Sequence, residues 1–314
     1  MVKRLLLASP RGYCAGVQRA VETVERALAL YGSPVYVRKQ IVHNSHVVED
    51  LRSRGAIFVD ALADVPEGAT VVFSAHGIAP AVRREAEGLR LTTIDATCPL
   101  VTKVHAQARR YAAAGYAIVL IGHAGHEEVE GTLGEAPEAI VLVQSTEEAE
   151  RVSLPPDRPL AYVTQTTLSV DETGEIVAVL RRRFPQIEGP AREDICYATS
   201  NRQWAVKELM NEIDLLLVVG SPNSSNSQRL VDVARADGTQ AHLVDDLRSI
   251  DERWLAGCET VGLTSGASAP ERLVAEVCDW FVARGAEVCE QQAVHEDVSF
   301  KLPVELRRAE RAAA

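Results

Sequence analysis

The stretch Ser9-Pro10-Arg11-Gly12-Tyr13-Cys14-Ala15-Gly16 opens a pattern of residues that recurs twice more along the chain and indicates the fold. A helical pattern comes first, then an apolar strand, then a polar loop rich in His, Ser, Asn or Glu. The second copy opens at DATCP around Cys98, and the third opens at DICYAT around Cys196. The first polar loop lies 29, 28 and 28 residues after its cysteine in the three copies. This regular spacing predicts one structural unit that is used three times.

Alternating helices and strands predict an α/β protein built of three similar units with small, mostly parallel sheets. The units are expected at residues 14–96, 97–193 and 194–300, with a tail at 301–314. The apolar run at residues 4–8 has no partner in its own unit, so we expect residues 1–13 to complete the sheet of the third unit. The charged, alanine-rich end from Glu305 predicts a frayed terminus.

Apolar runs and helical periodicity place the individual elements. Strands are expected at residues 34–37, 56–59, 70–73, 117–121, 160–163, 215–219 and 260–264. Helices are expected at residues 16–31, 45–54, 101–114 and 201–213. In parallel sheets, ligands bind beyond the carboxyl ends of the strands, where the polar loops of all three units lie.

Composition sets limits on the partners and the compartment. The chain has 314 residues, an apolar fraction of 46% and a net charge of −11, which argues against a nucleic-acid partner. Apolar runs are too short to span a membrane, and Pro10 interrupts the one that resembles the start of a signal peptide. Six cysteines in a chain of this length predict metal binding or catalysis in a reducing compartment, so we expect a cytoplasmic protein.

Three of the six cysteines are candidates for a shared metal centre. Cys14, Cys98 and Cys196 each lie just before a helix start, where the helix dipole favours the thiolate that binds metal. Three thiolates on one soft metal centre leave a coordination position open for chemistry. The alternative is ordinary buried packing, which we expect for the other three cysteines, at positions 258, 278 and 289.

The polar loops supply candidates for anion binding and proton transfer. His43, His76 and His126 lie in matched loops and predict metal ligation or anion binding, with His123 and His126 as an alternative zinc pair. The third unit offers hydroxyl and amide side chains that suit a phosphate cradle, although the same residues are typical of a plain turn-rich loop: Ser224, Ser225, Asn226 and Ser268. Glu128 and Thr166 are the proton-handling groups of the middle unit.

These motifs resemble those of the 4-hydroxy-3-methylbut-2-enyl diphosphate reductases, which catalyse the last step of the non-mevalonate isoprenoid pathway. The resemblance runs from residue 5 to about residue 307. It is carried by PRGYCAGV at 10–17, VHN at 42–44, FSAHG at 73–77, DATCPLVTKVH at 95–105, IGHAGH at 121–126, TQTTLSV at 164–170 and NSSNS at 223–227.

The resemblance implies a [4Fe–4S] cluster held by Cys14, Cys98 and Cys196, with the three units in a pseudo-threefold arrangement around it. The fourth iron would bind the allylic hydroxyl of the diphosphate substrate, and two electrons from a donor such as ferredoxin or flavodoxin would remove it as water. Glu128 would be the proton donor, and Thr166 would help to place the hydroxyl. The diphosphate would be held by His43, His76, His126, Ser224, Ser225, Asn226 and Ser268.

One position departs from the family pattern, and two other classes of protein compete with this interpretation. Family members often have proline directly after the middle-loop histidine, where this chain has Glu127. We expect that its side chain need not face the site, and that its charge would raise the pKa of Glu128. The competing hypotheses are a three-cysteine zinc hydrolase and a non-catalytic iron–sulfur sensor, which would need no diphosphate cradle.

Overall fold

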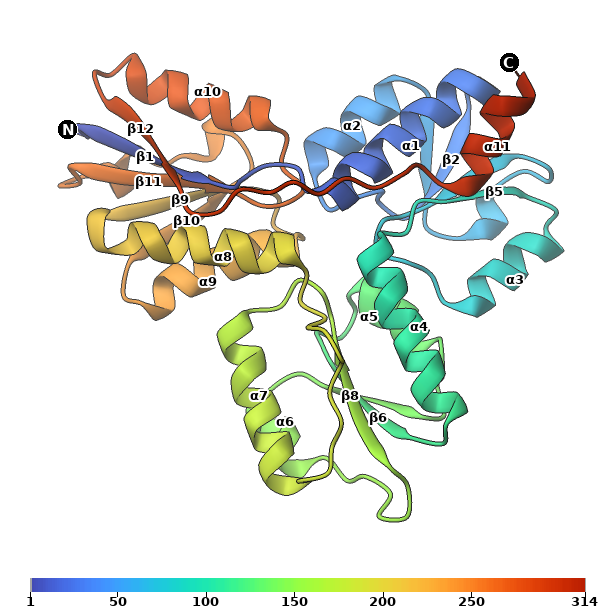
Figure 1. Ribbon diagram of the computed structural model, residues 1–314. Coiled ribbons are helices and arrows are strands. Elements are labelled where there is room, and N and C mark those ends of the chain that lie inside the picture. The colour runs from blue at the N-terminus through green and yellow to red at the C-terminus, as the bar shows by residue number, and fades with distance from the viewer. Residues whose placement is uncertain (1, 314) are drawn as a thin grey trace. The chain divides into compact units, whose positions relative to one another are not determined.

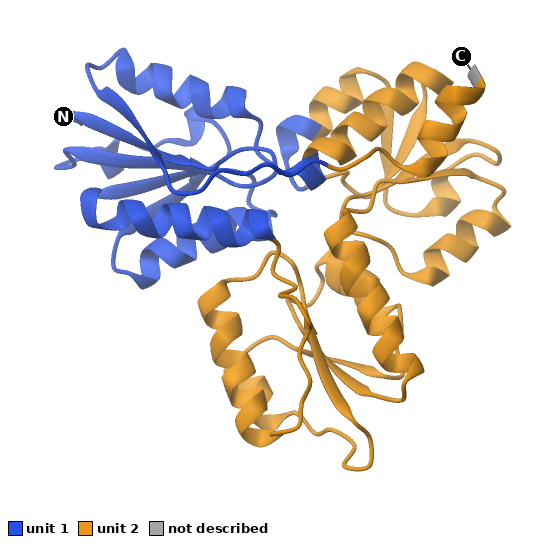
Figure 2. Cartoon of the chain, in the orientation of Figure 1, with its two compact units in different colours: residues 1–17, 43–47, 197–299 blue, residues 18–42, 48–196, 300–314 orange. Residues whose placement is uncertain are grey.

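The computed structural model describes residues 2–313, and the chain divides into two compact units (Figure 2). Unit 1 comprises Met1–Val17, His43–Val47 and Tyr197–Ser299, and unit 2 comprises Gln18–Val42, Val48–Cys196 and Phe300–Ala314. Among the described residues the strands form three sheets, and every strand pair is parallel. The predicted α/β class with small parallel sheets is therefore confirmed.

Unit 1 contains a five-stranded sheet in the order β10-β9-β11-β1-β12. Its strands are β1 (Arg4–Ser9), β9 (Leu215–Val219), β10 (Gln240–Val244), β11 (Thr260–Ser265) and β12 (Glu287–Gln292). The first strand, which we expected to join the sheet of the third repeat, pairs with β11 on one side and β12 on the other. It is apolar along most of its length because a central parallel strand is covered on both faces.

Alternation along β1 shows how the two faces of this sheet are filled. Leu5 and Leu7 pack in one apolar cluster with side chains of α10 (Glu271–Val282). Leu6 and Ala8 pack in a second cluster with α8 (Tyr197–Leu209) and α9 (Ser225–Ala236). Figure 1 shows α10 on one side of the sheet and α8 and α9 on the other. This layering holds the polar loops at the carboxyl ends of the strands in fixed positions.

Unit 2 contains two further sheets, in the orders β3-β2-β4-β5 and β7-β6-β8. Their strands are β2 (Val35–Arg38), β3 (Ala56–Val59), β4 (Thr70–Phe73), β5 (Thr92–Asp95), β6 (Ala117–Ile121), β7 (Ile140–Val143) and β8 (Leu160–Thr164). The remaining helices are α1 (Ala15–Tyr31), α2 (Ser45–Ser53), α3 (Pro80–Gly88), α4 (Pro99–Ala113), α5 (Glu127–Leu133), α6 (Thr146–Arg151), α7 (Val170–Arg183) and α11 (Val304–Ala313). Short 3₁₀ turns lie at Leu62–Asp64, Met210–Glu212, Leu247–Ser249 and Glu252–Leu255.

The predicted strands are confirmed to within one residue at each end, and the predicted helices to within four. The structure adds strands that sequence patterning missed, among them β5, β7, β10 and β12. β5 reads Thr-Thr-Ile-Asp, in which only Ile94 is fully buried, so its apolar signal is weak. Among the described residues, no helix has both the length and the apolar character that crossing a membrane requires.

The expectation of a frayed carboxyl-terminal end is wrong. Residues Val304–Ala313 form α11, and its Leu306 side chain is fully buried. The guanidinium of Arg307 also donates to the carbonyl of Leu302 at 3.0 Å. Although the segment is rich in charged residues, its apolar residues lie on one face of the helix, and this face can pack against the rest of unit 2.

Candidate functional site

The three repeated cysteines lie where the chain leaves a sheet and starts a helix. Cys14 follows β1 and precedes α1, Cys98 follows β5 and occupies the N-cap position of α4, and Cys196 directly precedes α8. The segment that leads to Cys196 also pairs with a strand, because Glu188 forms an isolated parallel bridge with Ala161 of β8. Each cysteine thus follows a stretch of chain that adds to the edge or centre of a parallel sheet.

A matched hydrogen bond anchors the backbone of each cysteine. Every one of the three N–H groups donates to a carbonyl in the loop after the neighbouring strand. The pairs are Cys14 to Ala267 at 3.1 Å, Cys98 to Ala75 at 2.9 Å and Cys196 to Thr166 at 3.0 Å. These three acceptor loops carry Ser268, His76 and Thr166, so each thiol is tied to a loop that carries a predicted site residue.

The chemistry of these thiols suits a soft metal centre. The three repeated cysteines are half-buried rather than fully enclosed. The N–H of Val17 lies 3.5 Å from the Cys14 sulfur, the type of contact that stabilises a metal-bound thiolate. Burial raises the pKa of the Cys258 and Cys278 thiols, which disfavours the thiolate that binds metal. The donor set fits an iron–sulfur cluster with three cysteine ligands.

The carboxyl group of Glu128 is the most deeply buried acid of the site. Its residue is 2% exposed, near the amino end of α5. The backbone N–H of Thr166 donates to one carboxyl oxygen at 2.6 Å, and the Thr166 hydroxyl donates to the other at 3.0 Å. The two proton-handling candidates of the middle unit are therefore in direct contact.

Burial raises the pKa of Glu128 above its ordinary value, and the hydrogen bonds from Thr166 offset only part of that effect. The predicted direction is therefore right, but burial is the first cause, rather than the charge of the neighbouring Glu127. A carboxylic acid that keeps its proton to higher pH is suited to donating it.

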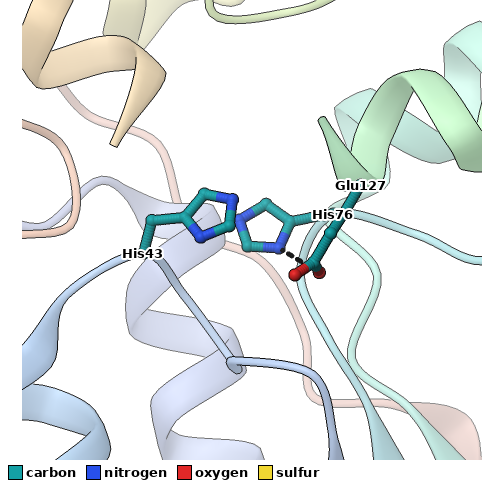
Figure 3. A group of neighbouring side chains, drawn as sticks. All are labelled: His43, His76 and Glu127. Carbon is teal, nitrogen blue, oxygen red and sulfur yellow. Dashed lines mark hydrogen bonds and ion pairs between the residues drawn. The ribbon is translucent and has the colours of Figure 1, made fainter. Parts of the chain in front are cut away.

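Glu127 faces His76, so the expectation that its side chain need not face the site is wrong. Its carboxylate lies 3.1 Å from Nδ1 of His76 (Figure 3) and accepts a hydrogen bond from Ser74 Oγ at 3.3 Å. Burial by itself raises the pKa of Glu127, but the hydrogen bond and charge of His76, with Lys39 and Ser74, outweigh it. The pKa of Glu127 therefore lies below its ordinary value, and the residue is an anion that orients an imidazole.

His126 is a neutral imidazole with an assigned tautomer. Its Nδ1 accepts the backbone N–H of Glu128 at 3.1 Å and so caps the amino end of α5. Burial, followed by the charge of His76, lowers the pKa of His126 to about 3. Because Nδ1 is an acceptor, Nε2 carries the proton and can donate it to an anion. The two rings of His76 and His126 meet edge to face, with centroids 5.7 Å apart.

Unit 1 gathers the remaining predicted residues around the amino end of α9. Ser224 is the N-cap of this helix, and Ser225 is its first residue. The Ser268 hydroxyl donates to the carbonyl of His43 at 2.9 Å and lies 3.5 Å from the Ser224 hydroxyl. The Asn223 amide lies 3.4 Å from Nδ1 of His43. Hydroxyls and an imidazole at a helix amino end form the kind of group that binds phosphate oxygens.

Asn226 has a supporting position in the same group. Its side-chain carbonyl accepts the N–H of Ala267 at 2.8 Å, and its amide donates to the Thr199 hydroxyl at 3.3 Å. Ala267 is also the residue whose carbonyl receives the Cys14 N–H. The structure therefore groups the predicted residues within each unit: Cys14, His43, Ser224, Ser225, Asn226 and Ser268 in unit 1, and Cys98, Cys196, His76, His126, Glu128 and Thr166 in unit 2.

The chain matches the LytB protein family over residues 5–281. It is 61% identical over 308 residues to the 4-hydroxy-3-methylbut-2-enyl diphosphate reductase of Acidothermus cellulolyticus, covering 98% of this chain and 91% of that protein. It is 58% identical over 311 residues to the reductase of the same name from Nocardia farcinica, covering 98% and 93%.

Solved structures agree with the sequence comparisons. The E-1-hydroxy-2-methyl-but-2-enyl-4-diphosphate reductase from Plasmodium falciparum superposes with a TM-score of 0.97 at 40% identity, covering 100% of this chain and 99% of that one. A second reductase structure, described as the terminal enzyme of the non-mevalonate pathway, has a TM-score of 0.62 at 30% identity and covers 90% of this chain and 100% of its own. The chain therefore belongs to the LytB protein family, and it is an oxidoreductase.

Proposed function

We propose that this protein reduces 4-hydroxy-3-methylbut-2-enyl diphosphate to isopentenyl diphosphate and dimethylallyl diphosphate. The allylic C–O bond breaks, two electrons and two protons enter, and the oxygen leaves as water. The names of its relatives support the substrate. The observation that carries the proposal is a fully buried carboxyl group of raised pKa, Glu128, hydrogen-bonded by Thr166 at the carboxyl end of a parallel sheet.

The cofactor in this proposal is a [4Fe–4S] cluster that Cys14, Cys98 and Cys196 hold. When bound, it supplies electrons one at a time and one iron without a cysteine ligand. The half-buried thiols at three helix starts and the matched backbone hydrogen bonds of these cysteines support this assignment. In the same proposal the three repeats are residues 14–96, 97–193 and 194–300 with 1–13, and each supplies one of the three cysteines.

Glu128 and Thr166 handle the proton. Hydroxide is a poor leaving group, so loss of the hydroxyl requires an acid at the oxygen. Glu128 retains its proton because burial disfavours the carboxylate. Thr166 fixes the carboxyl group with two hydrogen bonds, and its hydroxyl can turn to help place the substrate oxygen. Water exclusion around this pair favours transfer to the substrate rather than to solvent.

The diphosphate is held by neutral and imidazole donors in this proposal. They are His43, His76, His126, Ser224, Ser225, Asn226 and Ser268. His126 contributes an Nε2–H group, since its Nδ1 is already an acceptor. Glu127 orients the His76 ring through Nδ1. Asn226 acts in part through the backbone, since it holds the N–H of Ala267.

The electron donor in this proposal is a ferredoxin or a flavodoxin, because both deliver single electrons at low potential. The location in this proposal is cytoplasmic, because a reducing compartment keeps cysteine thiols in the form that binds metal.

Anaerobic purification followed by assays of iron, zinc, acid-labile sulfide and reductase turnover tests the proposal. We expect a brown protein with about four irons and four sulfides per chain that consumes the diphosphate substrate when a reduced dye is supplied. A colourless protein with stoichiometric zinc and hydrolytic activity would overturn it in favour of a zinc hydrolase. A loaded cluster without turnover or substrate binding would favour a sensor.

The diphosphate assignment has its own test. His43→Ala and Ser225→Ala should each weaken substrate binding about tenfold or more, because a hydrogen bond to a charged oxygen contributes about 1.5–3 kcal/mol. An analogue with the same alcohol but no phosphates is the control, and it should bind the parent and the variants equally poorly. Equal losses for the substrate and the analogue would mean that these residues serve the fold instead.

A further inference from the structure

A basic side chain lies after each of the three site cysteines at almost the same distance. Arg19 and Lys103 lie five residues after Cys14 and Cys98, and Arg202 lies six residues after Cys196. Each lies on the helix that its cysteine opens, α1, α4 or α8. The repeat therefore includes a cation in addition to the thiol and the polar loops.

Arg19 binds the segment that leads into Cys98. Its Nη1 donates to the carbonyls of Ala96 at 2.9 Å and Thr97 at 3.0 Å. Its Nε donates to the carbonyl of Lys301 at 2.8 Å, which ties the start of the carboxyl-terminal segment to the same point. A cation from the helix after the first cysteine thus holds the backbone directly before the second.

Lys103 binds the segment that leads into Cys196. Its Nζ donates to the carbonyls of Arg192 at 2.7 Å and Glu193 at 2.8 Å, and it lies 3.1 Å from the Asp194 carboxylate. The Asp194 side chain is fully buried, and it also accepts the N–H of Thr164 at 3.1 Å. This cation therefore joins the approach to the third cysteine to the end of β8.

Arg202 binds the segment that leads into Cys14. Its side chain is fully buried, and its Nη2 donates to the carbonyl of Gly12 at 2.9 Å. Its Nη1 donates to the carbonyl of Ala198 at 2.9 Å and pairs with Glu296 at 3.1 Å. Gly12 has φ +67°, and its N–H donates to the Ser265 hydroxyl at 2.8 Å, so both the N–H and the carbonyl of this residue are held.

The three contacts form a closed cycle. The helix opened by one cysteine sends a cation to the carbonyls before the next, from Cys14 to Cys98, from Cys98 to Cys196, and from Cys196 back to Cys14. A plain structural role would need hydrogen bonding but no charge, and neutral side chains make the same bonds to carbonyls. A cation at all three positions points to an electrostatic role as well, because three thiolates and the electrons added to a cluster concentrate negative charge there.

We propose that Arg19, Lys103 and Arg202 are positioning residues of the cofactor site: each fixes the backbone before one cluster cysteine. Arg19 also adds positive charge there, whereas Lys103 and Arg202 offset the negative charge of Asp194 and Glu296. Together they set how firmly the cluster is held and at what potential it is reduced. This inference rests on the proposed function, because it presumes the cluster.

Arg19 is the best residue for a test, because it is half-buried and its helix offers an exposed control in Arg26. The variants are Arg19→Gln, which removes the charge, Arg19→Lys, which keeps it, and Arg26→Gln. The readouts are the midpoint potential, from a redox titration monitored by electron paramagnetic resonance, and the rate at which an iron chelator removes the cluster.

Arg19→Gln should lower the equilibrium constant for one-electron reduction of the cluster about tenfold. This change corresponds to a shift of ~59 mV in the midpoint potential, to more negative values. It should also lose iron about 10- to 100-fold faster, the usual effect of altering a residue that supports metal ligands. Arg19→Lys should keep the potential near that of the parent protein and lose iron at an intermediate rate, since one ammonium replaces the fork of the guanidinium. Arg26→Gln should match the parent in both measurements.

Replacing the fully buried Arg202 risks unfolding, so Lys103→Met and Lys103→Arg repeat the comparison, with exposed Arg110→Gln as the control. Parent-like potentials and chelation rates in both Arg19→Gln and Lys103→Met would overturn the inference. Equal shifts in the charge-removing variants and their controls would overturn it too. A parent protein that binds no iron–sulfur cluster would overturn the proposed function itself, which is a distinguishable outcome.

Discussion

Replacing Glu128 with Gln should abolish most turnover while leaving the site assembled. The carboxyl group accepts one hydrogen bond from the Thr166 N–H at 2.6 Å and one from its hydroxyl at 3.0 Å. In Glu128→Gln, the amide oxygen can accept the N–H and the amide nitrogen can donate to the hydroxyl, which rotates to accept. Both contacts survive, so the cost in unfolding free energy should stay near ~1 kcal/mol.

The catalytic cost should be far larger, because the amide has no proton to give. A positioned general acid contributes about 10²- to 10⁴-fold, which corresponds to about 2.7–5.5 kcal/mol of the activation barrier. A large rise in the activation free energy, with only a small fall in the unfolding free energy, would distinguish a catalytic role from a structural one. We therefore expect kcat to fall by that factor, with unchanged iron content and little change in KM.

The pH dependence supplies an independent check. The pKa of Glu128 is raised above 4.5 by burial, so the acid form persists to higher pH in the folded protein. The rate of the parent should fall as pH rises through this raised pKa, and Glu128→Gln should lack that limb. Above pH 4.5, the Glu128 carboxyl group ionises in the unfolded chain before it ionises in the folded protein. The parent should therefore lose unfolding free energy as pH rises through the folded pKa. The variant should not show this loss.

Steady-state turnover with a chemically reduced dye, at several pH values, measures these effects. Glu130→Gln is the matched control, since Glu130 is exposed on the same helix. Near-parent turnover in Glu128→Gln, or an equal loss in Glu130→Gln, would refute the assignment of Glu128 as the proton donor.

Three further predictions concern the neighbouring groups. Cys98→Ser should remove the iron–sulfur absorption and turnover, whereas Cys289→Ser should keep both; a fully loaded Cys98→Ser protein would contradict the ligand assignment. Glu127→Ala should raise KM about tenfold with a smaller effect on kcat, because His76 loses its charged acceptor, worth ~1.5 kcal/mol or more; an unchanged KM would show that this orientation is dispensable. Burial lowers the pKa of His126 from 6.5 to about 3, so below pH 6.5 this imidazole binds a proton in the unfolded chain but not in the folded protein. Unfolding free energy should therefore fall as pH falls below 6.5, and urea titrations of His126→Gln should show a weaker dependence on pH.

Most of the fold could be predicted because its signals are local. Strands such as β6 and β9 are continuous apolar runs, which is typical of strands buried on both faces of a parallel sheet. Helices such as α1 are predicted by the spacing of apolar residues. The weakly patterned β5 was missed because its side chains are mostly polar, and its place depends on pairing with β4. The helix α11 was missed because burial of Leu306 outweighs a charged composition.

Residue types and spacing along the chain were enough to identify the repeat, the three candidate cysteines and the polar loops. The resemblance to the family motif then selected Glu128. Three features could be found only in the folded protein: burial raises the pKa of Glu128, Glu127 contacts His76, and Arg19 holds the carbonyls before Cys98. The partners in these contacts are 38 to 78 residues apart. The physical reason is that protonation and hydrogen bonding depend on which distant groups the sheets bring within about 3 Å and on how much water they exclude.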